Sequence, residues 1–243
     1  MSHRIDICPD AETMAARAAA AIAESLRAAR ARREVAHLAL SGGTTPVRTY
    51  RLLARAPRDL ERTELWFADE RCVGPQDPES NHRLVRETIA APAHLPAEAL
   101  HRMEGELGPH PGALRYAEQL REGVPPAPGS EIPALDLIVL GIGPDGHIAS
   151  LFPGHPALDA PPGALCLGVT DSPKPPPERI TLTLHVINHA NRCLLLASGE
   201  SKAGALAGAL GEPTSAAPAS LLNPDRLHVI ADRAAGALLP EYA

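Results

Sequence analysis

The fold is decided by residues 135–147, LDLIVLGIGPDGH, in which a short apolar run ends abruptly in a glycine-rich turn. The apolar part, residues 135–140, predicts a strand that is buried on both faces, as the central strands of parallel sheets are. The turn places Asp145 and His147 just beyond the carboxyl end of that strand. Because ligands of open α/β sheets bind beyond the carboxyl ends of the strands, this turn predicts part of a functional site.

Strands and helices are expected to alternate along the whole chain. Further apolar runs predict strands at 35–40, 64–68, 179–184, 192–197 and 226–231. Amphipathic or capped segments predict helices at 10–33, 46–53, 81–89, 111–122, 200–210 and 232–239. A polar loop is expected at 69–79 and a Pro-rich surface connector at 123–134. The alternation is typical of an α/β fold with a mostly parallel sheet, and neither side of the connector is complete enough to be an independent domain.

Composition excludes several classes of partner. The chain of 243 residues has a net charge of −6 and only 2% aromatic residues, which argues against nucleic acid and anionic membranes. Its longest strongly apolar stretch, residues 135–142, is far shorter than the ~20 residues of a membrane span. The four cysteines are Cys8, Cys72, Cys166 and Cys193. None belongs to a C-x-x-C pair, and the N-terminus lacks the pattern of a signal peptide, so we expect a cytoplasmic location.

The loop Ser41-Gly42-Gly43-Thr44-Thr45-Pro46 follows the predicted strand at 35–40. Its two glycines allow the backbone to approach a ligand closely. The helix start that follows, capped by Thr44 or Thr45, offers unpaired N–H groups that suit a phosphate. The loop lacks the lysine of a P-loop, and an ordinary strand-to-helix turn is the alternative interpretation.

Charged residues follow two other predicted strands. In the triplet 69–71, Asp69 can accept hydrogen bonds from sugar hydroxyls and Arg71 can hold an anion, although a solvated loop is the alternative. Lys202 is expected in the first turn of a helix, where a cation opposes the helix dipole, so an anion is expected nearby. The Pro-rich segment 172–179 presents two more cations in a stiff backbone.

The turn at 141–147 formally matches the dinucleotide fingerprint G-x-G-x-x-G, but no long helix can open at its third glycine, because Pro153 follows closely. His147 instead suits a general base, since imidazole titrates near neutral pH. A structural histidine is the alternative. His185 and His189 are four residues apart without the glutamate of a zinc protease, so no metal site is expected.

Taken together, six stretches resemble the 6-phosphogluconolactonase family. They are LALSGGTTP at 38–46, WFADERCV at 66–73, SNHRL at 80–84, LIVLGIGPDGHIASLFPGH at 137–155, SPKPPPERITLTL at 172–184 and SGESKA at 198–203. Related glucosamine-6-phosphate deaminases follow the same histidine with a stretch that contains the glutamate used for ring opening. Here residues 148–153 are IASLFP, which contains no acid and resembles the lactonase form.

The resemblance implies an open, Rossmann-like sheet with helices on both faces in a single domain, residues 1–243. It implies hydrolysis of 6-phospho-D-glucono-1,5-lactone to 6-phosphogluconate in the oxidative pentose phosphate pathway, without cofactor or metal, and we expect a monomer. His147 would be the base and Asp145 would orient it or the water. The expected substrate-binding residues are Ser41, Gly42, Gly43, Thr44, Asp69, Arg71, Arg179 and Lys202. A sugar-phosphate isomerase or deaminase, a non-catalytic sugar-phosphate sensor and a dinucleotide oxidoreductase are the alternatives.

Overall fold

The computed structural model describes residues 4–127 and 129–240. Its main sheet has six strands in the order β1-β9-β8-β5-β2-β3, and every neighbouring pair is parallel. These strands are β1 (Arg4–Cys8), β2 (Ala36–Leu40), β3 (Thr63–Phe67), β5 (Leu137–Gly141), β8 (Cys193–Ala197) and β9 (Leu227–Asp232). The predicted α/β fold with a central strand near 135–140 is therefore confirmed.

A second, smaller sheet is antiparallel and has the order β4-β7-β6. Its strands are β4 (Asp69–Arg71), β6 (Cys166–Val169) and β7 (Arg179–Leu182). Two expectations are corrected here: residues 69–71 pair as a strand instead of forming a loop, and the strand near 179–184 does not belong to the parallel sheet. Three polar residues carry no apolar pattern, so only the pairing with β7 makes β4 recognisable as a strand.

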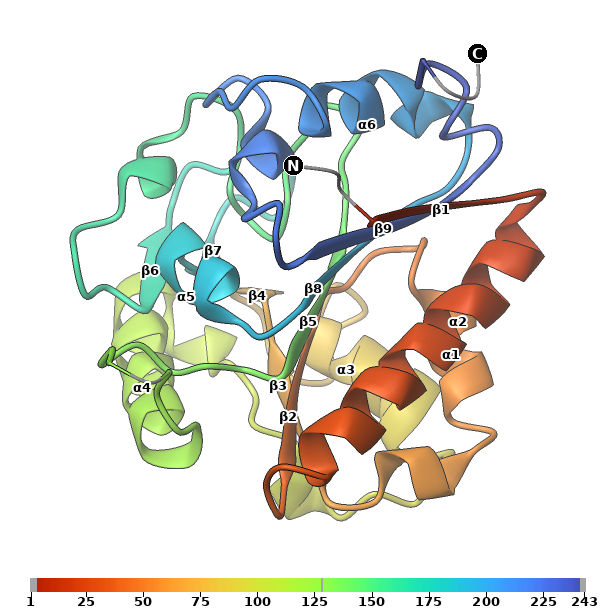
Figure 1. The fold of residues 1–243 in the computed structure, drawn as a ribbon. Coiled ribbons are helices and arrows are strands. Elements are labelled where there is room, and N and C mark those ends of the chain that lie inside the picture. Colours follow the sequence, from red (N-terminus) through yellow and green to blue (C-terminus); the bar gives the residue numbers. More distant parts are fainter. Residues whose placement is uncertain (1–3, 128, 241–243) are drawn as a thin grey trace.

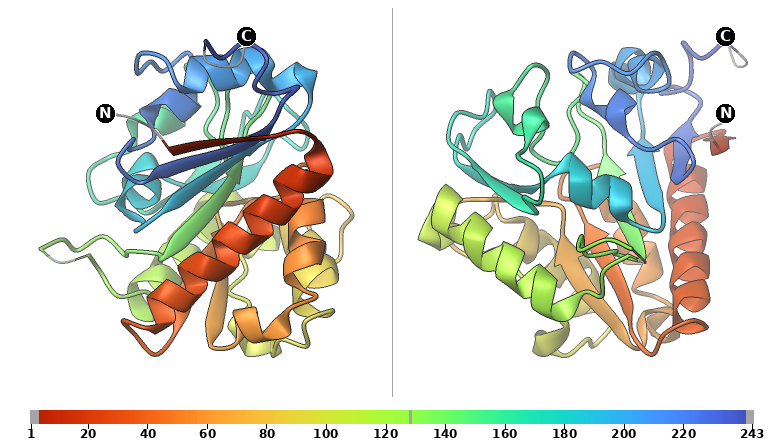
Figure 2. Two further views of the ribbon diagram at one scale, coloured as in Figure 1. Left: turned by 45° about the vertical axis from the view of Figure 1, so that its right-hand side comes forward. Right: turned by 60° about the vertical axis from the view of Figure 1, so that its left-hand side comes forward.

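Helices cover both faces of the main sheet (Figures 1 and 2). Their bounds are α1 (Ala11–Arg30), α2 (Val47–Leu53), α3 (Asn81–Val85), α4 (Pro109–Gly123), α5 (Leu184–His189) and α6 (Ala203–Ala209). The long helix α1 packs against α2 and the strands of the main sheet, whereas α4 packs against β6 and β7 of the small sheet. The small sheet and α4 therefore lie on the opposite side of the main sheet from α1.

Several predicted boundaries change for local reasons. The helix expected at 232–239 is a series of turns, in which Gly236 N donates to Asp232 O and Leu239 N donates to Gly236 O. The N-cap residue of α2 is Pro46, whose ring has no hydrogen-bonding atom that could cap the helix. Neither Thr44 nor Thr45 therefore caps this helix. Ser80 does cap α3, as expected, by accepting from Arg83 N.

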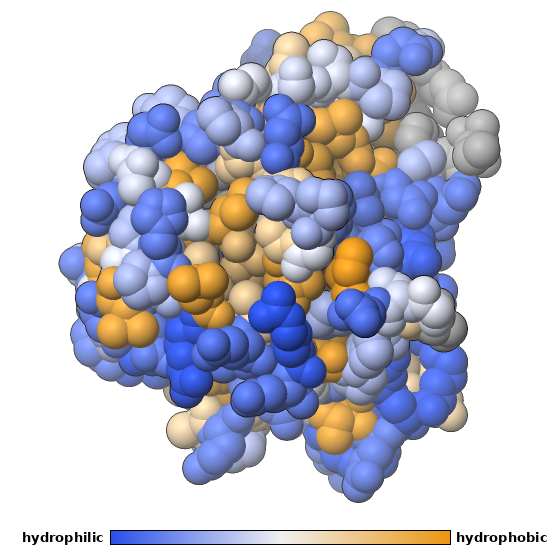
Figure 3. Space-filling view, turned by 90° about the vertical axis from the view of Figure 1, so that its left-hand side faces the viewer, coloured by the Kyte–Doolittle hydropathy of each residue, from blue (hydrophilic) through white to orange (hydrophobic). Residues whose placement is uncertain are grey.

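The apolar core lies between the main sheet and its helices. Trp66, Phe67 and Tyr50 are among its largest buried side chains, and residues 137–140 are all buried. On the face formed by α4 and its surroundings, apolar residues gather within a hydrophilic border (Figure 3). Among the described residues, no helix combines the length and apolar character needed to cross a membrane.

Candidate active site

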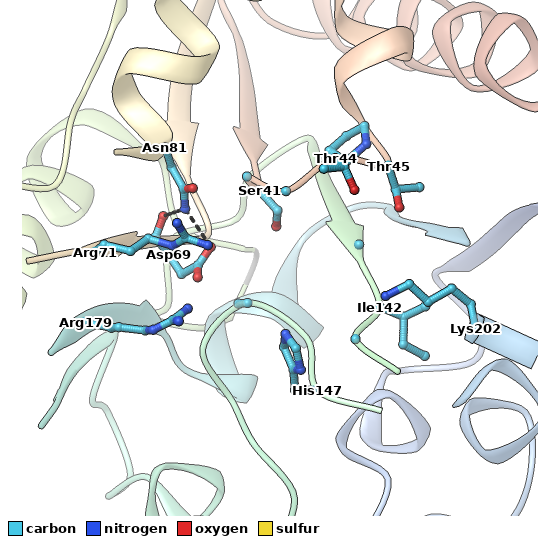
Figure 4. Close-up of a pocket in the computed structure, with 16 residues that line it drawn as sticks. Ser41, Thr44, Thr45, Asp69, Arg71, Asn81, Ile142, His147, Arg179 and Lys202 are labelled. Atoms are coloured by element: carbon cyan, nitrogen blue, oxygen red, sulfur yellow. Dashed lines mark hydrogen bonds between the residues drawn. The ribbon is translucent and has the colours of Figure 1, made fainter. Parts of the chain in front are cut away.

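The carboxyl ends of β2, β3, β5 and β8 open into one polar pocket of about 170 Å³ (Figure 4). Pockets that bind drug-sized ligands have volumes of roughly 300 Å³ or more, so this pocket suits a smaller metabolite. Nine predicted site residues line it: Ser41, Gly42, Gly43, Thr44, Asp69, Arg71, His147, Arg179 and Lys202. The other lining residues are Thr45, Pro46, Asn81, Gly141, Ile142, Gly143 and Ala149. The topology therefore brings together strand-end loops that are far apart in the sequence, from Ser41 to Lys202.

The imidazole of His147 projects into this pocket. Asp145 does not line the pocket but contacts this imidazole. His147 Nδ1 is 2.5 Å from Asp145 Oδ1, and no described residue bonds Nε2. Since a carboxylate accepts only, Nδ1 carries the proton in this pair and Nε2 keeps its lone pair. Burial lowers the pKa of His147, and Lys174 lowers it further, while Asp145 acts in the opposite sense. A neutral imidazole with a free nitrogen in a pocket has the form required of a general base.

Asp145 is ionised by its neighbours. Burial works to raise the pKa of this carboxyl, but hydrogen bonds from His147 and Lys174 outweigh it and lower the pKa to about 2. Lys174 Nζ lies 3.0 Å from the same Oδ1 atom. Lys174 was not singled out in the sequence as a site residue, although it lies in the Pro-rich segment noted for its cations. Asp145, His147 and Lys174 thus form a group of three contacting side chains.

The glycines of the 141–147 turn make this arrangement possible. Gly143 N donates to His147 O at 2.9 Å, and Gly146 adopts a φ of +85° that favours glycine. A Cβ on Gly143 would lie 2.0 Å from His147 Nδ1 and 2.4 Å from Asp145 Oδ1. Position 143 therefore has no room for any side chain while the pair keeps this geometry.

The 41–46 loop forms the opposite wall of the pocket. Gly43 has a φ of +89°, and a Cβ on Gly42 would lie 1.8 Å from Asn81 Oδ1. The Ser41 side chain points into the pocket in Figure 4. Its buried Oγ has no hydrogen-bond partner among the described residues. Because an unpaired buried hydroxyl is unfavourable, this atom is available to a bound ligand.

Asp69 is held by two residues that the sequence did not single out individually. Asn81 Nδ2 donates to Asp69 Oδ1 at 3.2 Å, and Ser150 Oγ donates to Oδ2 at 2.7 Å. All three side chains are buried. Asn81 and Ser150 lie within stretches shared with the family, SNHRL and ASLFPG, which is the only signal that could have found them. Asp69 consequently has a fixed orientation at one end of the pocket.

Glu70 points away from the pocket and organises the backbone beside it. Its buried carboxyl accepts from the backbone N–H groups of Arg71, Asn81 and His82 and from the Ser80 hydroxyl. Burial raises the pKa of Glu70, against the effect of these donors. The residue thereby holds the first turn of α3 and, with it, the Asn81 side chain in the pocket wall.

The three predicted cations differ in how many donors they leave for a ligand. Buried Arg179 donates to the carbonyls of residues 174, 175 and 176 and weakly to Ser150 Oγ. Arg71 donates to Glu79 O, and its buried Nε has no described partner. The ammonium of Lys202 bonds to none of the described residues; burial and the nearby Lys174 lower its pKa. Figure 4 shows Arg71 and Arg179 at one end of the pocket and Lys202 at the other, with His147 between them.

The two histidines weighed as metal ligands lie elsewhere. His185 and His189 occur on α5, as expected, and neither lines the pocket. His189 Nδ1 is 2.7 Å from the carbonyl of His185, and His185 Nε2 is 3.2 Å from Ala160 O. Within residues 4–127 and 129–240, no three His, Cys, Asp or Glu side chains come together in a way that could hold a metal ion.

Comparison with known proteins agrees with this geometry. Residues 9–231 match the family described as glucosamine-6-phosphate isomerases/6-phosphogluconolactonase. The chain belongs to this family. Its relatives include the 6-phosphogluconolactonase of Mycobacterium tuberculosis, 36% identical over 249 residues that cover 99% of this chain and 100% of that protein. The human 6-phosphogluconolactonase is 38% identical over 210 residues, which cover 83% of this chain and 80% of the human protein.

Solved structures of the family have the same fold. The 6-phosphogluconolactonase of Trypanosoma cruzi superposes with a TM-score of 0.86 at 25% identity, covering 98% of this chain and 97% of that one. The resemblance inferred from the motifs is therefore confirmed, both for the 6-phosphogluconolactonase family and for its open α/β fold. The relatives named here are enzymes, which places this chain in an enzyme family.

Proposed function

We propose that the chain hydrolyses 6-phospho-D-glucono-1,5-lactone to 6-phospho-D-gluconate, in the cytoplasm and within the oxidative pentose phosphate pathway. The observation that carries the proposal is the neutral His147, whose free Nε2 faces a small pocket with cations at both ends. Membership of the family and the names of the relatives support the same reaction. The sequence 148–153 supports the lactonase over the deaminase, because it contains no acid that could open a sugar ring.

In the proposed mechanism, His147 Nε2 takes a proton from a water molecule as the water oxygen attacks the lactone carbonyl carbon. The tetrahedral intermediate then collapses, the bond from that carbon to the ring oxygen breaks, and the imidazolium returns its proton to the ring oxygen. Asp145 accepts from Nδ1 throughout and stabilises the imidazolium while it exists. Every proton is accounted for by this one residue, so the reaction needs no covalent nucleophile, cofactor or metal.

The phosphate is assigned to the end of the pocket with Lys202, Thr44 and Thr45. Lys202 has no ion-pair partner among the described residues, and the loop backbone can approach an anion closely at Gly43. Arg71, Arg179 and Asp69 lie at the other end and are assigned to the sugar and the lactone group. Ser41 and Gly42 lie between the two ends of the pocket.

The function is tested by following the loss of freshly generated 6-phosphogluconolactone, with glucosamine 6-phosphate tested in parallel. We expect rapid loss of the lactone, an undetectable release of ammonia from the amino sugar, and no change of the lactonase rate after exhaustive treatment with EDTA. Turnover of the amino sugar alone would replace the proposal with the deaminase. A rate that EDTA abolishes and one divalent metal restores would overturn the metal-free mechanism.

Substituting Lys202 with methionine is expected to raise KM for the phosphorylated lactone about 10–100-fold, because one charged hydrogen bond of about 1.5–3 kcal/mol is lost. The value of kcat should change much less, since a phosphate remote from the reacting carbon binds ground and transition states alike. Unphosphorylated gluconolactone serves as the control substrate: it should be poor for the parent protein and insensitive to Lys202→Met. Equal use of both lactones by the parent protein would refute the phosphate assignment.

A further inference from the structure

Lysine is rare in this chain and occurs only at the candidate site. The sequence contains twenty-one arginines and two lysines, Lys174 and Lys202. Lys202 lines the pocket. Lys174 contacts Asp145 and His147, and His147 also lines the pocket. An ammonium is a compact charge with three freely oriented donors, whereas a guanidinium is a planar fork. At these two places the chain departs from its otherwise uniform use of arginine, and both places belong to the candidate site.

The backbone of Lys174 is fixed from two sides. Ser172 Oγ donates to Lys174 O at 2.8 Å and accepts from Lys174 N at 3.2 Å. The buried guanidinium of Arg179 donates to the carbonyls of Lys174, Pro175 and Pro176. Most of the donors of Arg179 thus hold the segment 172–178 in place. This fixed backbone places the Lys174 ammonium beside Asp145 and His147.

At that position the ammonium shares a single acceptor with the imidazole. Lys174 Nζ lies 3.0 Å from Asp145 Oδ1 and 3.1 Å from His147 Nδ1. Because Nδ1 uses its proton to reach Asp145, both nitrogens donate to the carboxylate, and they face each other as two donors. A positive charge on the imidazole would then lie beside the positive charge of Lys174.

The charge on His147 is thus set by opposing neighbours. Asp145 and, from β4, Asp69 favour the imidazolium. Lys174 and burial, which includes the Phe152 ring with its centroid 4.8 Å away, favour the neutral imidazole. Arg179 also lies by this ring, with its guanidinium carbon 5.6 Å from the Phe152 centroid, and Lys202 lies across the pocket. Without Lys174, the carboxylate that orients the base would also promote its protonation.

We propose that Lys174 is a positioning residue that offsets the charge of Asp145 and keeps His147 unprotonated and oriented at neutral and mildly acidic pH. The inference rests on the proposed function, since it assigns a partner to the base of that reaction. Asp145 and Lys174 then have separate effects on the base: the carboxylate selects the tautomer, and the ammonium prevents the second protonation.

The first test is the pH profile of kcat/KM for Lys174→Met. The base must be neutral, so the rate falls as pH decreases through the pKa of His147. Removal of Lys174 raises this pKa. We therefore expect the acidic limb of the profile to move to higher pH by about 1 unit, which lies within the range of pKa changes that one nearby like charge produces. Below the limb, a one-unit shift costs roughly tenfold in rate, and this loss should shrink as the pH rises above the limb.

Two matched variants separate charge from shape. Lys174→Arg keeps the charge, and its limb should stay at the parental pH. Lys202→Met removes the other lysine, and it should raise KM without moving the limb. A limb that does not move in Lys174→Met, or that moves equally in Lys202→Met, would overturn the inference.

A second readout does not depend on activity. Reductive methylation with ¹³C-formaldehyde labels two lysines and the α-amino group, and Lys174→Met assigns the signals. The chemical shift of the Lys174 signal should change in one step over the pH range in which His147 titrates. His147→Gln should abolish this titration step. If this step is present but the lactone is not hydrolysed, the proposed function fails and the pairing stands. If the lactone is hydrolysed but the step and the limb shift are both absent, the pairing fails and the function stands.

Discussion

His147→Asn is expected to lower kcat about 10²–10⁴-fold, which is the typical contribution of a positioned general base. The amide cannot take a proton from water, although it preserves the polarity and much of the volume of the imidazole. Binding should survive, because the cations Arg71 and Lys202 lie at the two ends of the pocket and are untouched. The measurement is steady-state hydrolysis of the phosphorylated lactone, with calorimetric binding of 6-phosphogluconate to show that the site is intact.

Asp145→Asn is the matched control for this variant. It should leave an imidazole in the pocket but replace the charged acceptor of Nδ1 with a neutral amide, whose NH₂ group can also donate to Nδ1 and favour the other tautomer, so a smaller loss of kcat is expected. A folded His147→Asn protein with near-normal turnover would show that another residue activates the water. Equal losses in both variants would instead indicate that the tautomer is as important as the base itself.

Gly143→Ala is expected to lower kcat about 10²-fold or more, although residue 143 has no side chain and donates no proton in the mechanism. The added Cβ would lie 2.0 Å from His147 Nδ1 and 2.4 Å from Asp145 Oδ1, so the pair must move. A displacement of about 1 Å of a catalytic group can cost this much. The measurement is kcat together with the thermal unfolding midpoint, and the loss of activity should greatly exceed any loss of stability.

Gly74→Ala provides the matched control. A Cβ at residue 74 has no heavy atom within 4 Å beyond its chain neighbours, and the residue does not line the pocket. This variant should retain both activity and stability. Normal turnover in Gly143→Ala would mean that the 141–147 turn can adjust without disturbing the base, which would contradict the rigid arrangement described above.

Residues 135–147 show how far local sequence can reach. An apolar run of five or six residues must be buried on both faces, and the glycines after it must form a turn, so a central strand with a functional loop follows without knowledge of the rest of the chain. The same reasoning identified the loops at 41–46 and 198–202, because parallel strands direct their carboxyl ends to one edge. The convergence of these loops on one pocket is therefore a consequence of parallel topology.

Other features depend on contacts that no local pattern encodes. The strand β4 has three polar residues and exists because β7, more than one hundred residues later, pairs with it. Ser150 binds the carboxylate of Asp69 from 81 positions away. In each case a partner distant in sequence determines the role of the residue.

The sequence by itself determined most of the alternation of strands and helices, the parallel core and the loops that meet at its edge, because burial and turn geometry are local requirements. It did not reveal the strands β1, β4 and β6. Only the tertiary structure decided which charges face one another there. The ammonium of Lys174 reaches Asp145 across 29 positions, and its effect on His147 depends on a separation of 3.1 Å. Electrostatic interactions depend on distance in space and on burial, and neither quantity can be obtained from the spacing of residues along the chain.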